Sequence, residues 1–179
     1  MSKDNENRQT TASIGPVVGS SHLAEGRKPS LSEVELALSM CGNGFHRWIT
    51  RCMAAAGVAD LGSLDVLVLH SINHRGRPKK LADLCLILNI EDTHTVNYAL
   101  KKLQSMDLVE SARQGKEKVV AITDKGEALC IRYKEVREAL LFEAVDAVGL
   151  SEEDLSRVAA LLRSLSGQYD QAARAAASL

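Results

Sequence analysis

Residues 79–126 constrain the fold more than any other part of the chain, because they combine two helical patterns and two strand patterns in a fixed order. A short apolar run over residues 80–88 is followed by a polar turn and a longer amphipathic pattern over residues 93–106. Two β-rich runs, 108–113 and 118–122, then flank a charged loop with a single glycine. Apolar residues at helical spacing predict helices, and β-rich runs around a glycine turn predict a hairpin. The order as a whole predicts a helix-turn-helix followed by a β-wing.

The longer helix has one apolar face and one polar face. Val96, Leu100 and Leu103 recur at intervals of four and three residues, which places them on the buried side. Asp92 is placed to cap the helix. The opposite face carries small hydrogen-bonding side chains near its start and lysines further along, which suits a helix that reads base edges in the major groove. We expect phosphate contacts from Lys80, Lys101 and Lys102, base contacts from Thr93, His94, Thr95, Asn97 and Tyr98, and wing contacts from Arg113, Lys116 and Lys118.

Charge is distributed unevenly along the chain. The formal net charge is −1, yet residues 75–118 hold nine lysines and arginines against six acids. A local excess is what matters for phosphate contacts, because one face of a protein makes them. The sequence has no phosphate-binding glycine loop, nucleophile elbow or H-E-x-x-H motif. We therefore expect a protein that binds double-stranded DNA and is not an enzyme. The alternative is a winged-helix module that binds another protein without specific DNA binding.

The sequence gives little evidence for a redox site or a metal site. The four cysteines form no C-x-x-C pair and follow apolar stripes, which favours reduced, buried thiols. Oxidant sensing by Cys41 or Cys52 is the alternative. His70 and His74 are four residues apart and could share a metal, but no Cys, Asp or Glu stands at a clear ligand spacing beside them, which favours a helix end stabilised by histidine. We expect no cofactor and no metal.

The chain length of 179 residues fits about one domain. Residues 1–30 are polar, show no apolar period and are expected to form a disordered tail, followed by a single domain over 31–178. Within it we place the winged helix-turn-helix at 62–123 and long helices at 31–57 and 124–178. Ser32 and Glu35 have the spacing of a capping box at the first helix. No run is apolar enough for a membrane span and no secretory segment opens the chain, so a cytoplasmic protein is expected.

The outer helices carry apolar seams that a compact winged helix does not need. Their residues recur at intervals of three and four, close to a heptad. A second copy of the chain would bury both seams, whereas a monomeric bundle is the alternative. We expect a homodimer whose interface includes Val34, Leu38, Cys41, Leu155, Val158, Leu162 and Leu165.

Several of these segments resemble the MarR family of winged-helix transcription regulators. The likeness covers roughly residues 31–172 and is strongest in the helix pattern from Thr95 to Val109, in Ile122-Thr123-Asp124-Lys125-Gly126, and in Leu150-Ser151-Glu152-Glu153-Asp154-Leu155. The resemblance implies a homodimer joined by the terminal helices, with one recognition helix of each subunit in successive major grooves. It thereby implies sequence-specific regulation of transcription on a pseudo-palindromic operator. It also allows for a small-molecule effector in a cleft near Trp48.

The chain departs from the family pattern at two informative places. Asp107 stands where the family usually has a glycine before the first wing strand, and aspartate enters the left-handed region more readily than most residues. The Asp-x-Arg signature of the wing is absent, so Arg113, Lys116 and Lys118 are the candidates for its role. These departures indicate a divergent branch of the family.

Overall fold

The computed structural model describes residues 15–115 and 117–179. A short 3₁₀ turn, η1 (Ser21–Leu23), precedes the first long helix. The remaining elements are α1 (Pro29–Ala55), α2 (Ser63–Asn73), the 3₁₀ turn η2 (His74–Gly76), α3 (Leu81–Leu88), α4 (Thr93–Ser105), β1 (Val109–Gln114), β2 (Glu117–Ile122), α5 (Asp124–Asp146) and α6 (Glu152–Ala176). The mainly helical fold with a small antiparallel wing is the one that the sequence predicts.

α1 begins two residues earlier than the sequence predicts. Pro29 occupies its first turn, where the fixed φ of proline and its missing N–H are tolerated. The predicted capping box of Ser32 with Glu35 is wrong, because the Ser32 hydroxyl donates to the carbonyl of Leu23 at 2.6 Å. Of the segment predicted to be a disordered tail, residues 1–14 lie outside the described residues. Its remainder contains η1 and the first two residues of α1.

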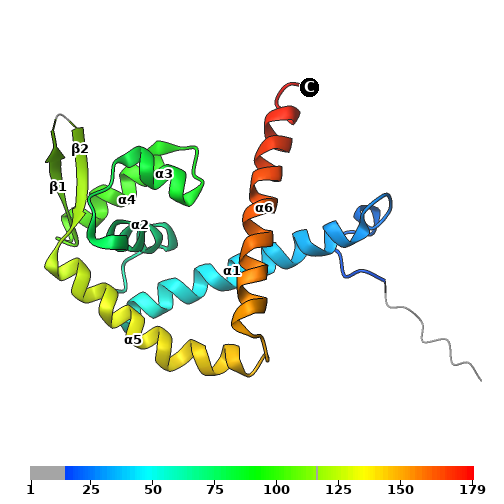
Figure 1. Ribbon diagram of the computed structural model, residues 1–179, viewed down its shortest axis with the longest axis horizontal. Coiled ribbons are helices and arrows are strands. Elements are labelled where there is room, and N and C mark those ends of the chain that lie inside the picture. The colour runs from blue at the N-terminus through cyan, green and yellow to red at the C-terminus, as the bar shows by residue number, and fades with distance from the viewer. Residues whose placement is uncertain (1–14, 116) are drawn as a thin grey trace, which may run out of the picture.

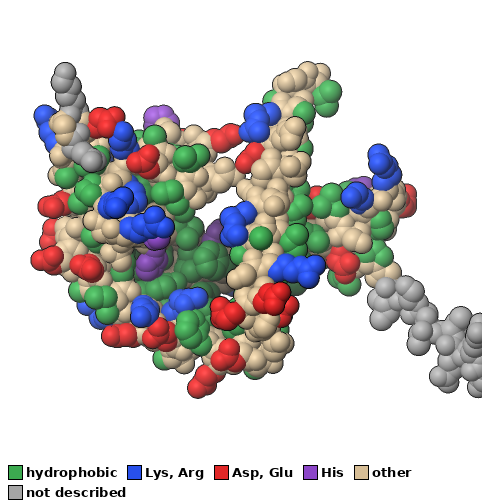
Figure 2. Space-filling model, viewed as in Figure 1, with side chains coloured by type: hydrophobic (Ala, Val, Ile, Leu, Met, Phe, Trp, Pro, Cys, Tyr) green, Lys and Arg blue, Asp and Glu red, His purple; other side chains and the backbone are tan. Residues whose placement is uncertain are grey.

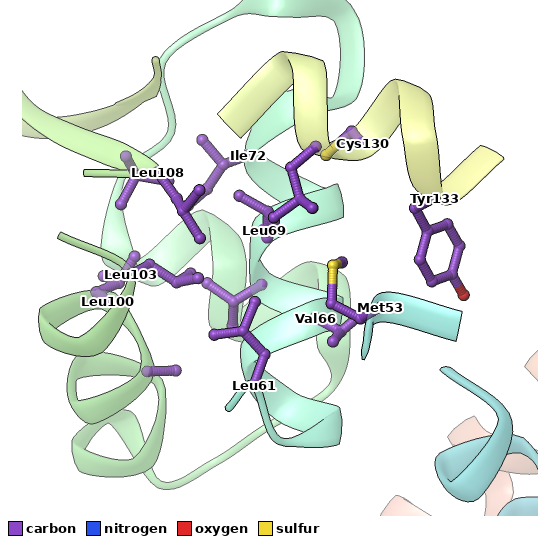
Figure 3. Packing of buried hydrophobic residues seen from close by; sticks show 14 of the residues in the cluster. Met53, Leu61, Val66, Leu69, Ile72, Leu100, Leu103, Leu108, Cys130 and Tyr133 are labelled. Atoms are coloured by element: carbon purple, nitrogen blue, oxygen red, sulfur yellow. The ribbon is translucent and has the colours of Figure 1, made fainter. Parts of the chain in front are cut away.

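Residues 61–126, here called the reading unit, pack α2, α3, α4 and the wing around one core (Figure 1). Figure 3 shows side chains of α2, α4 and α5 converging on this core together with Met53 from the end of α1. Leu69, Leu103 and Leu108 are fully buried within it. Because Val96, Leu100 and Leu103 all face inward, the predicted apolar side of the second helix is confirmed.

The wing is a hairpin whose strands pair from Val109 with Ile122 to Gln114 with Glu117. Gly115 adopts a φ of 63° at the turn, a backbone conformation that glycine reaches at little cost. On the edge of β2 that faces away from β1, Val120 forms a short antiparallel bridge with Lys79. The N–H of Lys79 donates to the Val120 carbonyl at 2.9 Å, and the Val120 N–H donates to the Lys79 carbonyl at 2.8 Å. The chain entering α3 is thereby fastened to the wing.

The wing joins α5 through a tightly packed corner. Asp107 adopts a φ of 59°, as expected of a residue that replaces a glycine there. Thr123 caps α5 by accepting the Gly126 N–H at 3.0 Å, and its hydroxyl donates to the Asp107 carbonyl at 2.8 Å. Gly126 is buried against the carbonyl of Leu108, so that a Cβ at this position would overlap the carbonyl oxygen.

The outer helices extend away from the core. α1 and α5 run along one side of the reading unit, and α6 rises from the end of α5 and crosses α1 (Figure 1). In α1 the buried residues are confined to the last two turns, and no residue of α6 is buried. The cap of α6 is as predicted: Ser151 accepts the Asp154 N–H at 3.1 Å, and the Asp154 carboxylate accepts the Ser151 N–H at 3.0 Å.

Candidate nucleic-acid interface

Helix α4 is held at its start by Asp92. The Asp92 carboxylate accepts the His94 N–H at 2.8 Å, which confirms the predicted N-cap. The hydroxyl of Thr95 donates to the Asp92 carbonyl at 2.8 Å, so this side chain also takes part in the turn. The cap fixes where α4 begins and how its first turn is oriented.

One stripe of α4 faces solvent. His94, Tyr98 and Lys101 follow one another at intervals of four and three residues on the side opposite Val96, and all three are exposed. Tyr98 is 73% exposed. Hydrogen-bonding, aromatic and cationic groups therefore line an exposed side of α4, as a helix inserted into a groove of DNA requires, and His94 and Tyr98 border a shallow groove with Leu64 of α2.

Two predicted base-contacting residues lie at the margins of this stripe. Thr93 is exposed at the first turn. Asn97 is half-buried and lines a groove between α4 and β2 together with Gln104 and Lys118. The groove places the Asn97 amide between the helix and the wing rather than at the crest of the helix.

The described part of the wing carries two cations side by side. Arg113 and Lys118 are cross-strand partners, both are exposed, and they line one groove with Ser111. Lys116, which the sequence also places in the wing contact, lies outside the described residues. Two neighbouring cations on a projecting hairpin suit contact with the DNA backbone.

Lys80 and Lys102 are already paired within the protein. The Nζ of Lys80 lies 2.5 Å from the Glu117 carboxylate at the end of the wing, and this hydrogen bond raises the pKa of Lys80. Both side chains are exposed, so phosphate can compete for this lysine. The Nζ of Lys102 lies 2.8 Å from the buried Asp65 carboxylate. We therefore omit Lys102 from the proposed set of phosphate contacts.

Figure 2 shows lysine and arginine side chains over the reading unit with acidic side chains between them. Gln104 belongs to this surface, although the sequence did not lead us to predict it. Its amide donates to the Ser111 hydroxyl at 2.8 Å and joins α4 to β1. Its spacing of seven residues from Asn97, which places both on one side of a helix, was the available signal.

The remaining candidate chemistry has a structural explanation. Cys52, Cys85 and Cys130 are buried, whereas Cys41 is exposed, contrary to the expectation for all four. Burial raises the pKa of the Cys52 thiol and raises that of Cys130 to about 11, which disfavours the reactive thiolate. No group of three or more metal-binding side chains gathers within residues 15–115 and 117–179.

His70 faces a shallow cavity of about 370 Å³ between α2 and α5, lined also by Cys130 and Tyr133. Trp48, near which the resemblance allows an effector cleft, is not among the residues lining this cavity. In the described part of the chain, no helix has the length and apolar character needed to cross a membrane.

The predicted dimer residues form a largely uncovered apolar surface. Val34 is 37% exposed, Val158 47% and Leu162 41%. Leu38, Leu155 and Leu165 are half-buried, and Leu165 lines a groove with Val34 where α6 crosses α1. Cys41 is exposed on the same helix as Val34. We call the surface of these seven residues the terminal seam.

The comparison with known families identifies the reading unit. Residues 61–126 match the family model described as a winged helix DNA-binding domain. No curated protein sequence matches the chain.

The chain as a whole has the fold of MarR-family regulators, as its resemblance to them predicts. A MarR-family regulator from Neisseria meningitidis is 18% identical, with 80% of this chain and 95% of that one covered and a TM-score of 0.62. A mutant MarR from E. coli complexed with operator DNA is 17% identical, with coverages of 79% and 99% and a TM-score of 0.62. A MarR transcriptional regulator from Methanosarcina mazei is 19% identical, with coverages of 76% and 96% and a TM-score of 0.60.

Proposed function

We propose that the protein is a MarR-family transcription regulator that binds a specific DNA sequence as a homodimer. The observation that carries the proposal is the exposed stripe of His94, Tyr98 and Lys101 on α4, flanked by Arg113 and Lys118 of the wing. This stripe belongs to a winged helix DNA-binding domain, and the similar E. coli protein was crystallised with operator DNA.

The side chains divide into two roles by chemistry. Thr93, His94, Asn97 and Tyr98 can exchange hydrogen bonds with base edges, which is how sequence is read in the major groove. Lys80, Lys101, Arg113 and Lys118 supply the positive charge that neutralises phosphates and fixes the position of the protein on the duplex. The hydroxyl of Thr95 is used in the turn, which makes it the weakest of the base-contact predictions.

Dimer formation is supported by the terminal seam. Apolar side chains on α1 and α6 are exposed to water in the single chain. In a two-fold dimer, the same residues of the second copy can cover them. A two-fold dimer would present two recognition helices to one side of the duplex. The operator would then be a pseudo-palindrome with half-sites about one helical turn, ~10 base pairs, apart.

The proposal is tested by selecting bound fragments from random DNA and measuring binding to the selected operator over a range of salt concentrations. A DNA regulator should select a pseudo-palindrome and lose affinity steeply as salt rises. A protein-binding winged helix would select no sequence, and this outcome would refute the proposal.

Asn97→Ala tests the register of α4 on the selected operator. If the amide pairs with a base, this change should cost about 1–3 kcal/mol of binding free energy and relax preference at one position in each half-site. Gln171→Ala, which removes an exposed amide of α6, is the matched control. Equal binding of Asn97→Ala and wild type to selected and scrambled DNA would show that the amide does not read a base.

A small-molecule effector is a further part of the proposal. The cavity between α2 and α5 supports it, because it adjoins α2, which packs against the recognition helix. The corresponding measurement is the operator affinity of the dimer with and without a candidate ligand.

A further inference from the structure

The end of α3 is linked directly to α6. The Asn89 side-chain amide donates to the two Asp170 carboxylate oxygens at 3.0 and 3.3 Å and to the Ser166 hydroxyl at 3.2 Å. In Figure 1, the C-terminal half of α6 rises beside the reading unit. Within residues 15–115 and 117–179, no other hydrogen bond or ion pair joins the reading unit to α6.

The orientation of the Asn89 amide follows from its partners. A carboxylate only accepts hydrogen bonds, so the NH₂ group of the amide, rather than its oxygen, must face Asp170. A hydrogen bond to a charged acceptor is stronger than one between neutral groups. The contact therefore resists displacement by water better than an ordinary surface hydrogen bond.

Asn89 also forms the turn between the two helices of the helix-turn-helix. Its φ of 52° and ψ of 50° end α3 in the left-handed conformation, and the Ile90 N–H then donates to the Cys85 carbonyl at 2.9 Å. Three residues later Asp92 caps α4. The group that α6 holds is thus part of the turn from which the recognition helix starts.

We infer that Asn89, Ser166 and Asp170 form a tie that sets the position of the recognition helix relative to α6, and thereby the half-site spacing that the dimer accepts. The inference rests on the proposed function. α6 carries part of the terminal seam, so it is fixed to the partner subunit in the proposed dimer. A reading unit tied to α6 keeps a fixed distance from its counterpart, whereas an untied one can pivot on α5 and α1. Asn89 and Asp170 are therefore positioning residues that need not touch DNA.

A swap of the two side chains tests the tie. Asn89→Asp retains a residue that tolerates the left-handed conformation but places a carboxylate against Asp170, which should break the contact. Asn89→Asp combined with Asp170→Asn restores a donor and an acceptor with their positions exchanged, and it keeps the wild-type net charge. Asn89→Gly keeps the backbone conformation and removes only the amide, so it separates the tie from the turn.

The readout is the ratio of affinities for the selected operator and for operators with half-sites one base pair closer or further apart. A change in general electrostatics affects numerator and denominator alike, so the ratio reports spacing alone. Asn89→Asp and Asn89→Gly should lower this discrimination roughly 3- to 10-fold, the loss expected of one solvent-exposed hydrogen bond. The exchanged pair should restore it. In parallel, amide hydrogen exchange in residues 88–92 should quicken in the two single variants and slow again in the exchanged pair.

An unchanged spacing ratio in Asn89→Asp and Asn89→Gly would overturn the inference, and so would a loss that the exchanged pair does not restore. Failure of the wild-type protein to select any operator would refute the proposed function itself, and the spacing role would fall with it. The exchange data distinguish these cases, because they report whether α6 holds the turn without any DNA present.

Discussion

The Asp65 carboxylate lies 2.8 Å from the Nζ of Lys102 and 2.8 Å from the N–H of Gly62. One buried acid thus caps the start of α2 and holds the last turn of α4. Lys102 lies one helical turn after the exposed Tyr98, but its ammonium is engaged by this buried carboxylate, so we assign Lys102 a structural role.

Lys102→Met should therefore destabilise the fold without weakening the salt dependence of DNA binding. Removing the ammonium leaves the Asp65 carboxylate buried with one partner fewer, at a cost of about 1–3 kcal/mol in the free energy of unfolding. Urea unfolding measures this cost. Lys134→Met removes an exposed ion pair with Glu138 and should change stability by less than about 0.5 kcal/mol. Equal stabilities of the two variants would contradict the structural role.

Lys101→Ala should show the opposite behaviour. Its ammonium is exposed on the proposed DNA-binding stripe, so its removal should leave stability nearly unchanged. The slope of the logarithm of affinity against the logarithm of salt concentration should fall by about one unit for each phosphate that the variant no longer neutralises. A slope equal to that of wild type would place the phosphates away from this side of α4.

Leu162→Glu should convert the proposed dimer into monomer, because a carboxylate in an apolar interface loses its hydration without gaining a partner. The side chain is 41% exposed in the single chain, so the helix content should be retained. Light scattering measures the loss of the dimer, and circular dichroism measures the retained helix content. Arg157→Glu, on the opposite side of α6, is the control and should remain dimeric. A dimer of Leu162→Glu would exclude the terminal seam as the interface.

His70 should make the protein less stable in mild acid. Burial lowers the pKa of His70 from 6.5, and no described group pairs with its buried Nε2 atom. Below about pH 6.5 the unfolded imidazole takes up a proton that the folded one refuses. The associated stability is therefore complete above this pH and is lost as the pH falls toward the folded pKa.

The matched variant is His70→Phe, which keeps an aromatic ring against Tyr133, whose ring centroid lies 4.5 Å away. Its free energy of unfolding should fall less between pH 7 and pH 5 than that of wild type. Parallel pH profiles for the two proteins would show that His70 does not titrate across this interval.

The parts of the fold that follow from local patterns could be predicted from the sequence. Capping by Asp92 and Ser151, the apolar side of α4 and the left-handed Asp107 all depend on near neighbours in the chain. The start of α1 could not be placed, because Ser32 has the right spacing for a cap but bonds to Leu23 instead. Local spacing cannot tell a capping serine from one that holds a preceding turn.

The site was predicted less well than the fold, because long-range partners decide which polar side chains remain free. Lys101 and Lys102 are equivalent in sequence, yet only one meets a buried carboxylate 37 residues away. Asn89 likewise looks like a left-handed turn residue, and nothing nearby indicates a partner 81 residues later. The seven residues of the terminal seam, the half-site spacing and the effector remain predictions.

The bridge between Lys79 and Val120 covers one edge of the wing and so limits its pairing with strands of other molecules. β2 has β1 along one edge and a backbone partner on the other, so β1 supplies the principal open edge of the described hairpin. That edge carries the exposed charges Glu110 and Arg113. Charged side chains along a short edge strand oppose pairing with the strand of another molecule. A hairpin that projects from the protein, as the proposed contact of the wing with DNA requires, is thereby kept from becoming a template for aggregation.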